Sequence, residues 1–141
     1  MNKKLSITVS VLAAVITIIN VAFVINDAFY YNLDNLPKGN FIREDFDQSI
    51  LFGKGYKLKV YQVEKTRHFP SAVRVELWND NTNSFKTIYW QTNTEGTIIN
   101  WLDGDRVVVT INGVPIDIEN QTYDCRDWEN QIYVQKTEFV K

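Results

Sequence analysis

The pattern of hydrophobic and polar residues in this chain changes once, near residue 26. Before that point, the residues from Leu5 to Ile25 carry no charge and include only Ser, Thr and Asn as polar interruptions. After it, short runs of β-branched and aromatic residues alternate with clusters of Asn, Asp and Gly. A long apolar run predicts a helix, whereas short runs between turn residues predict β-strands. We therefore expect one N-terminal helix followed by an all-β domain.

The stretch 88–118 carries the strongest strand signal. It consists of four short runs of β-branched and aromatic residues, with breaks at 93–96, at 103–105 and at Asn112-Gly113. Each break contains Gly or Asn, which tolerate the positive φ angles of tight turns. Asn-Gly between two apolar runs favours a two-residue hairpin, because the twist of that turn matches the twist of the flanking strands. This stretch therefore predicts four strands joined by tight turns.

Further strands are expected on both sides of this stretch. Alternation of apolar and polar residues predicts strands over 56–63 and 71–78, and the strand over 85–91 follows a turn at 79–84. Residues 41–43 are expected to form a short edge strand, and 131–140 a last strand or an irregular tail. The prediction is a small antiparallel sheet or sandwich of about six or seven strands, built from sequential hairpins.

One of these strands also predicts which side chains are exposed. In the run 71–78, three apolar residues alternate with Arg74 and Glu76. Successive side chains of a strand point to opposite faces of the sheet. The apolar residues are therefore expected to face the core, and Arg74 and Glu76 to point outward and pair with charges on a neighbouring strand.

The apolar run from Leu5 to Ile25 predicts a membrane segment. As a helix it would be about 31 Å long, close to the hydrocarbon thickness of a bilayer. A cleaved secretory signal has a shorter apolar region, of about 7–15 residues, followed by a small-x-small cleavage site, and none follows this run. We expect an uncleaved signal anchor; secretion after cleavage and a buried helix of a soluble protein remain alternatives.

Charge and composition then divide the chain into segments. Lys3 and Lys4 precede the apolar run, and basic residues stay on the cytoplasmic side. Residues 32–40 are rich in Asn, Asp, Pro and Gly, which is typical of a linker. The predicted organisation is a cytoplasmic stub over 1–4, a transmembrane anchor over 5–25, a linker over 26–40 and an extracytoplasmic β domain over 41–141.

Composition narrows the range of partners and cofactors. The 141 residues are 45% apolar and carry a net charge of −2, without a cluster of Lys and Arg. Nucleic acid is not expected as a partner, because neutralising phosphates requires such a cluster. The single cysteine, Cys125, rules out an internal disulfide and thiolate metal clusters. We therefore expect neither a nucleic-acid partner nor a cofactor.

The usual catalytic motifs are missing from the sequence. It contains no Gly-x-Ser-x-Gly, no phosphate-binding glycine loop and no His-x-x-x-His, and its one histidine, His68, is expected in an exposed loop. Acidic residues are more numerous towards the C-terminus. If the hairpins fold back, they could form a calcium site or a carboxylate pair for hydrolysis: Asp103, Asp105, Asp117, Glu119 and Asp124. Their spacing matches no EF-hand loop, so we expect turn residues, with no catalytic residue and no metal site.

The aromatic residues of the β domain are the more interesting candidates for binding. Most are expected in the core, but two of them exposed together would make a flat platform for a sugar or a peptide. The set consists of Tyr89, Trp90, Trp101, Tyr123, Trp128 and Tyr133. The candidate binding residues are three of these aromatic residues and two turn carboxylates: Trp90, Trp101, Asp103, Asp105 and Tyr123.

Several phrases resemble, in order and spacing, a family of small bacterial envelope proteins catalogued as domain of unknown function 5412. They lie between residues 35 and 126: Asn35-Leu36-Pro37-Lys38-Gly39-Asn40-Phe41-Ile42, Tyr56-Lys57-Leu58-Lys59-Val60-Tyr61, Ser71-Ala72-Val73-Arg74-Val75-Glu76-Leu77, Lys86-Thr87-Ile88-Tyr89-Trp90, Trp101-Leu102-Asp103, Val109-Thr110-Ile111-Asn112-Gly113 and Tyr123-Asp124. The resemblance implies an N-terminal membrane or lipoprotein segment and a small β-rich domain, without implying an activity. Residues 52–56 and 65–70 depart from the family pattern.

Three hypotheses for the function follow. The first is a non-enzymatic envelope protein that binds an envelope protein or a cell-wall polymer through its sheet face or its turns. The second is a carboxylate- or metal-dependent hydrolase that uses the acidic residues between Asp103 and Asp124. The third is an immunity or inhibitor protein that acts on a membrane partner, for which the sequence of the anchor helix should matter.

Overall fold

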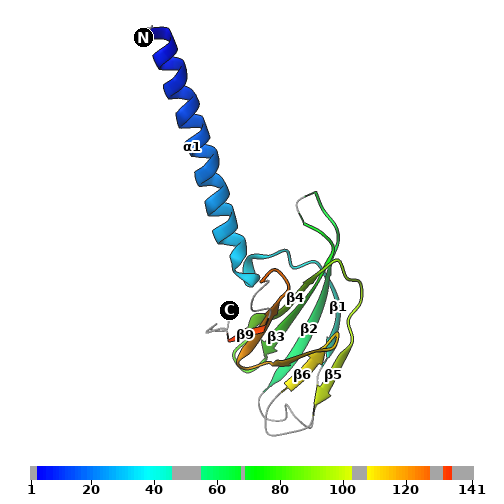
Figure 1. The fold of residues 1–141 in the computed structure, drawn as a ribbon. Helices are drawn as coiled ribbons and strands as arrows, with labels where there is room; N and C mark the ends of the chain where they lie inside the picture. The colour runs from blue at the N-terminus through cyan, green and yellow to red at the C-terminus, as the bar shows by residue number, and fades with distance from the viewer. Residues whose placement is uncertain (1–2, 46–54, 68, 103–107, 128–131, 135–141) are drawn as a thin grey trace. The chain divides into compact units, whose positions relative to one another are not determined.

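The computed structural model describes residues 3–45, 55–67, 69–102, 108–127 and 132–134 (Figure 1). The chain divides into two compact units, one up to Leu36 and the other from Pro37 onward. Within the described residues, one α-helix and one short 3-10 helix precede nine strands. The predicted class, an apolar helix followed by an all-β domain, is confirmed.

The first unit is dominated by helix α1, Lys3–Tyr31, which is followed by the 3-10 helix Leu33–Asn35. The part of α1 from Lys3 to Asn26 is long and apolar enough to cross a membrane, and its side chains are not buried. Its hydroxyl groups donate to backbone carbonyls one turn earlier, as from Thr17 Oγ1 to the Ala13 oxygen at 2.9 Å. These internal bonds satisfy the hydroxyl groups of Thr8, Ser10 and Thr17.

Helix α1 is longer than the predicted membrane segment. It continues past Ile25 to Tyr31, into the segment that the sequence predicts to be a linker. Asn and Asp weaken a helix only slightly, and the first proline is Pro37. The helix ends at Tyr31, and the next residue, Asn32, caps the 3-10 helix, because its side chain accepts a hydrogen bond from the Asp34 amide at 2.9 Å.

The larger sheet of the second unit has six strands, in the order β1-β2-β3-β4-β8-β9. They are β1 Asn40–Asp45, β2 Tyr56–Val63, β3 Ala72–Asn79, β4 Ser84–Thr92, β8 Gln121–Asp124 and β9 Ile132–Val134. Strands β1 to β4 form an antiparallel meander, and the predicted edge strand at 41–43 is part of β1. Strand β9 confirms that part of 131–140 is a strand, while 135–140 lies outside the described residues.

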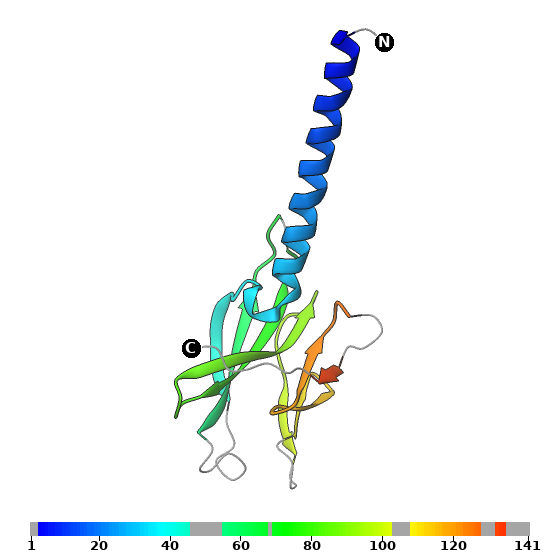
Figure 2. The ribbon, with the colours of Figure 1, turned by 90° about the vertical axis from the view of Figure 1, so that its left-hand side faces the viewer.

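The smaller sheet has three antiparallel strands, β5 Ile99–Leu102, β6 Val108–Ile111 and β7 Val114–Asp117. These strands form the connection between β4 and β8, which pair in parallel (Figure 2). Parallel neighbours require a long crossover, because a tight turn joins only antiparallel strands. In this chain the crossover is a small sheet instead of a helix.

The tight turns carry the backbone angles that the sequence predicts. In the β6–β7 hairpin, Asn112 has φ 48° and Gly113 has φ 83°. The break at 93–96 has positive φ at Asn93, 55°, and at Gly96, 79°. The four strands predicted between 88 and 118 are β4, β5, β6 and β7. The break at 103–105 lies outside the described residues.

The hydrophobic core is formed by side chains from both sheets. Its fully buried members in the larger sheet include Leu58, Val75 and Leu77, and those of the smaller sheet include Ile111 and Ile116. Burying a side chain of this size stabilises the fold by about 1.5–3 kcal/mol. The core therefore joins the two sheets into one domain.

Three expectations about the sheet are corrected by the structure. Nine described strands replace the expected six or seven, and the β4–β8 pair is parallel instead of antiparallel. Strand β8 was not predicted, because its residues follow a turn and alternate weakly. In β3, Arg74 and Glu76 do not point into solvent, since their exposed fractions are 2% and 0%. They pair with each other at 2.9 Å, between Nη2 and Oε1.

Gly39 brings the chain close to strand β2 just before β1 begins. Its φ is +75°, and an added Cβ would lie 2.7 Å from the carbonyl carbon of Gln62. Only glycine allows this close approach of two backbones. The approach positions Lys38, the preceding residue, against the outer face of the sheet, which is the face opposite the core.

Candidate functional site

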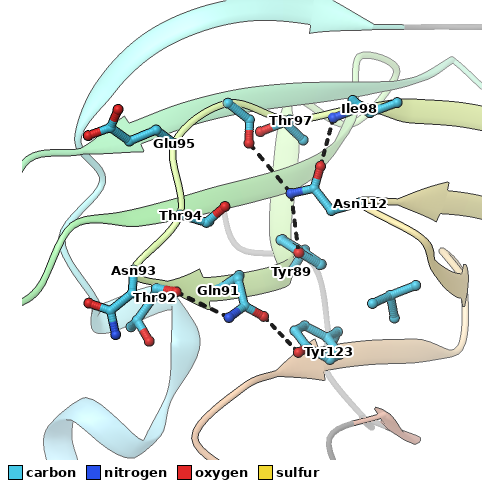
Figure 3. A pocket seen from close by; sticks show the side chains of 12 residues that line it. Tyr89, Gln91, Thr92, Asn93, Thr94, Glu95, Thr97, Ile98, Asn112 and Tyr123 are labelled. Atoms are coloured by element: carbon cyan, nitrogen blue, oxygen red, sulfur yellow. Dashed lines mark hydrogen bonds between the residues drawn. The ribbon is translucent and has the colours of Figure 1, made fainter.

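The candidate site is a pocket beside the turn that connects the two sheets (Figure 3). Its volume is about 560 Å³, which lies in the range of small-molecule sites. Strands β4 and β8, the turn 93–98 and the β6–β7 hairpin contribute its walls. The lining residues are Tyr89, Gln91, Thr92, Asn93, Thr94, Glu95, Gly96, Thr97, Ile98, Asn112, Val114 and Tyr123.

Two tyrosines from the parallel pair of strands form the aromatic wall of the pocket. Tyr89 on β4 and Tyr123 on β8 are direct partners in the register. Their rings stack at 5.0 Å with an interplanar angle of 20°. The Tyr123 hydroxyl donates to Gln91 Oε1 at 2.7 Å. The parallel pairing of β4 and β8 thus positions three polar groups on one side of the pocket.

Asn112 connects the hairpin to the turn and to the aromatic wall. Its Oδ1 accepts a hydrogen bond from the Ile98 amide at 2.8 Å. Its Nδ2 donates at 3.5 Å both to the Tyr89 hydroxyl and to the Gly96 carbonyl. One side chain therefore contacts three parts of the pocket, as the dashed lines of Figure 3 show in part.

The turn itself is held from the other side by Gln62 of strand β2. Its Nε2 donates to the Thr94 carbonyl at 3.3 Å, and its Oε1 accepts from the Gly96 amide at 3.4 Å. Arg43 of β1 adds a 2.7 Å bond to the Thr97 carbonyl. The pocket wall is thus anchored to the larger sheet by side chains from two further strands.

Thr97 supplies a polar group that has no partner within the described part of the chain. Its Oγ1 atom is buried and makes no hydrogen bond. A buried hydroxyl without a partner costs about 1–3 kcal/mol, so a native structure rarely keeps one without a reason. Thr97 lines the pocket, but its hydroxyl is not exposed there, so a ligand would recover that free energy once the Thr97 side chain turns toward the pocket.

The pocket is polar but almost uncharged. Of the 12 described residues that line it, Glu95 alone carries a charge, and its side chain is exposed. Burial raises the pKa of Tyr89 to about 12, and burial also raises the pKa of Tyr123. Both phenols therefore stay protonated at neutral pH and offer hydroxyl groups. The chemistry of the pocket suits a neutral ligand that both donates and accepts hydrogen bonds.

Of the three predicted binding residues that the structure describes, one lies at this pocket. Tyr123 lines it, whereas Trp90 belongs to the outer face of the sheet, where it lies opposite Arg74 in the register. Trp90 is 1% exposed, and its Nε1 has no hydrogen-bond partner among the described residues. Trp101 packs on the core and donates from Nε1 to Asp45 Oδ1 at 3.0 Å. Asp103 and Asp105 lie outside the described residues, as do His68 and Trp128.

The sequence analysis missed the amide groups of the pocket. Asn112 was interpreted as a turn residue only, and Gln91 as part of a strand. One signal was available, since Tyr89 and Gln91 are two residues apart on one strand and so share a face. No local signal brings Thr97 or Asn112 next to that face, because their positions depend on the pairing of distant strands.

The described carboxylates of the acidic segment contact turns and a neighbouring cation. Asp117 Oδ1 accepts from the Glu119 amide at 3.0 Å, and Asp124 Oδ2 lies 2.7 Å from Arg126 Nη2. The Glu119 carbonyl accepts from Lys86 Nζ at 2.6 Å, and burial lowers the pKa of Lys86. Among the described residues, no three His, Cys, Asp or Glu side chains gather as metal ligands would.

The helix and the two sheets define a class of protein, a small two-sheet β domain that follows an apolar helix long enough to cross a membrane. A family model described as a family of unknown function, DUF5412, matches residues 3–128. The chain belongs to this family, and the match includes the helix and all strands up to β8. No curated protein and no solved structure matches the chain.

Proposed function

We propose that this chain is a non-enzymatic, membrane-anchored binding protein of the cell envelope, and that its pocket binds a sugar unit of a cell-wall polymer. The observation that carries the proposal is the buried, unpaired hydroxyl of Thr97 in a pocket whose described lining is neutral apart from the exposed Glu95 and includes amides and phenols. A ligand hydroxyl is the natural partner for such a group.

The chemistry of sugars supports this choice of ligand. A sugar ring offers several hydroxyl groups that both donate and accept, together with an apolar C–H face. Amide side chains such as Asn112 match the hydroxyl groups. The rings of Tyr89 and Tyr123 are buried and stack on each other, so the apolar surface that the C–H face can contact is the exposed Ile98 side chain. Among the described lining residues, Glu95 is the only charged group that an anionic or cationic ligand would meet.

The location in the envelope is supported by the N-terminal segment. The helix from Lys3 to Asn26 is apolar and unburied, and its only charges are two lysines at its start. The positive-inside rule then orients the β domain to the outside of the cytoplasmic membrane. Protease treatment of intact cells should remove the β domain. In a separate measurement, the mass of the protein purified from untreated cells should include residues 1–25. A mass that begins after Ile25 would mean cleavage and secretion instead.

The binding experiment uses the full chain in a polyoxyethylene detergent, because that detergent has no sugar headgroup. Cosedimentation with purified cell-wall polymer is measured, followed by calorimetry with soluble fragments of it. Thr97→Val should weaken binding about fivefold, because it removes one hydrogen bond of about 1 kcal/mol. The matched control is Thr110→Val, on β6 outside the lining, which should bind as the wild type does. Equal binding by all three proteins, or no binding by the wild type, would overturn the proposal.

Two further measurements separate this function from the alternatives. A hydrolase would release new reducing ends or peptides from the polymer during the incubation, whereas a binding protein would leave it intact. An immunity or inhibitor protein would depend on the sequence of α1, whereas a tether would not. Replacing α1 by an unrelated membrane helix should therefore leave polymer binding unchanged.

A further inference from the structure

A second constellation of side chains lies on the outer face of the larger sheet and belongs to no part of the pocket. Three rings from neighbouring strands, Tyr61 of β2, Trp78 of β3 and Phe85 of β4, lie beside the ammonium group of Lys38. Trp78 and Phe85 stack on each other at 5.0 Å, and the ammonium group of Lys59 lies 3.7 Å from the Trp78 centroid. The distances from Lys38 Nζ to the ring centroids are 5.0, 5.4 and 5.0 Å. We call these three rings the aromatic cage. A cation within about 6 Å of a ring face is attracted by its π electrons.

A buried carboxylate lies next to the cage. The Glu76 side chain is fully buried, and its Oε2 lies 3.6 Å from Lys38 Nζ. This distance exceeds that of a hydrogen bond, for which about 2.7–3.2 Å is usual. Glu76 already accepts from Trp78 Nε1 at 2.8 Å and from Arg74 Nη2 at 2.9 Å. The cage therefore holds the Lys38 ammonium by charge and by the rings, and Lys38 donates no direct hydrogen bond to Glu76.

This geometry determines which chemistry the cage recognises. A site that takes a positive charge without accepting an N–H bond accommodates a fully methylated ammonium group, which has no N–H to donate. Methylation also lowers the cost of removing the ammonium from water, so cages of aromatic rings select such groups. The ion pairs next to the cage balance without Lys38: Arg74 pairs with Glu76, and Lys57 and Lys59 are offset by Glu44 and Asp80.

We propose that the aromatic cage is a binding site for a quaternary ammonium group and that Lys38 is its internal occupant, which an external ligand displaces. Lys38 is suited to leave, since 46% of its side chain is exposed and its stem is flexible. The site lies on the opposite face of the sheet from the sugar pocket, so the two proposals fail or hold independently.

The test is a titration of the full chain with choline. Binding is measured by the change in the NMR resonance of the Trp78 indole N–H. The chain has four tryptophans, so Trp78→Phe assigns the signal. The solvent is again a polyoxyethylene detergent, which lacks an ammonium headgroup. The neutral control ligand is 3,3-dimethyl-1-butanol, which has the shape of choline without its charge. Lys38→Ala should bind choline about tenfold more tightly than the wild type, because the internal competitor is gone.

A double variant and a second ligand complete the experiment. Lys38→Ala/Phe85→Leu removes one wall of the cage and should lose most of the gained affinity. Glycerophosphocholine identifies the source: binding like that of choline assigns a lipid headgroup, and weaker binding assigns a free small ammonium compound. The proposal is overturned when folded Lys38→Ala responds to choline no more than to the neutral alcohol. If Lys38→Ala does not fold, the wild type provides the test. The NMR chemical shift of Lys38 Cε should then move towards the value of a solvent-exposed lysine as choline is added. An unchanged chemical shift would overturn the proposal.

Discussion

The two faces of the six-stranded sheet are both buried, but by different physical means. On the core face, apolar side chains such as Leu58, Val75 and Leu77 pack against the smaller sheet. On the outer face, Arg74 and Glu76 are as buried as the core residues but form an ion pair. Apolar burial is favourable almost regardless of geometry, whereas a buried charge is tolerated only beside its partner. The outer face is therefore the more specific of the two and the more easily disrupted.

The largest effect is expected from breaking the ion pair. Glu76→Ala removes the carboxylate that pairs with the buried Arg74 guanidinium, which should lower the free energy of unfolding by about 3–5 kcal/mol. Urea unfolding of the full chain in detergent, followed by tryptophan fluorescence, measures this loss. Replacing both residues, as Arg74→Met/Glu76→Leu, should recover most of it. A loss below about 1 kcal/mol for Glu76→Ala would mean that the outer face does not depend on its buried ion pair.

The neighbouring residue on the same strand tests the core face. Leu77→Ala should cost about 2–5 kcal/mol, through the lost apolar area and the cavity that remains. The matched control is Ile98→Ala, since Ile98 is 67% exposed and should change stability by less than about 0.5 kcal/mol. In contrast to the ion pair, a volume-conserving change, Leu77→Met, should cost less than about 1.5 kcal/mol. Equal losses for Leu77→Ala and Leu77→Met would contradict simple apolar packing.

The free energy of unfolding should also depend on alkaline pH, through a buried tyrosine on each face of the sheet. Burial, and then the charge of Glu76, raises the pKa of Tyr61 to about 12; burial raises the pKa of Tyr89 on the core face to about 12. An unfolded tyrosine titrates near 10, so the folded state holds more protons between pH 10 and 12 and stability falls as pH rises there. Each tyrosine should contribute about 2–3 kcal/mol to this loss.

Unfolding measured at pH 9 and at pH 12 checks the alkaline prediction. Tyr61→Phe and Tyr89→Phe should each flatten the pH dependence, and the double variant should flatten it most. Stability of the wild type that stays constant over this range would contradict the raised pKa values of both tyrosines.

The smallest effect concerns the pocket at the edge of the core face. Thr97→Val replaces an unpaired buried hydroxyl by a methyl group and should raise the free energy of unfolding by about 1 kcal/mol. The opposite sign is expected for Ser84→Ala, because the buried Ser84 hydroxyl lies 2.5 Å from Thr82 Oγ1 in a hydrogen bond. A Thr97→Val protein that is more stable but binds polymer less well would link the unpaired hydroxyl to binding. Lower stability in both variants would contradict that link.

Much of the fold could be predicted because its signals are local. The apolar run from Leu5 to Ile25 and the turn at Asn112-Gly113 depend on residues that are adjacent in the sequence. Strand β8 was not predicted, because its partner β4 lies about 30 residues earlier in the chain and the three strands of the smaller sheet come between them. The pocket was missed for the same reason, since Asn112 meets Tyr89 only after that crossover has formed.

By itself, the sequence determined the single apolar helix, the all-β class, the positions of most strands and turns, and the family. Those features follow from the period of the hydrophobic pattern and from backbone preferences, which act over a few residues. The tertiary structure alone decided that Arg74 and Glu76 are buried together, that Lys38 lies in a cage of three rings, and that Thr97 keeps an unpaired hydroxyl. Alternation along a strand assigns a side chain to a face, but whether that face meets solvent depends on what the rest of the chain packs against it.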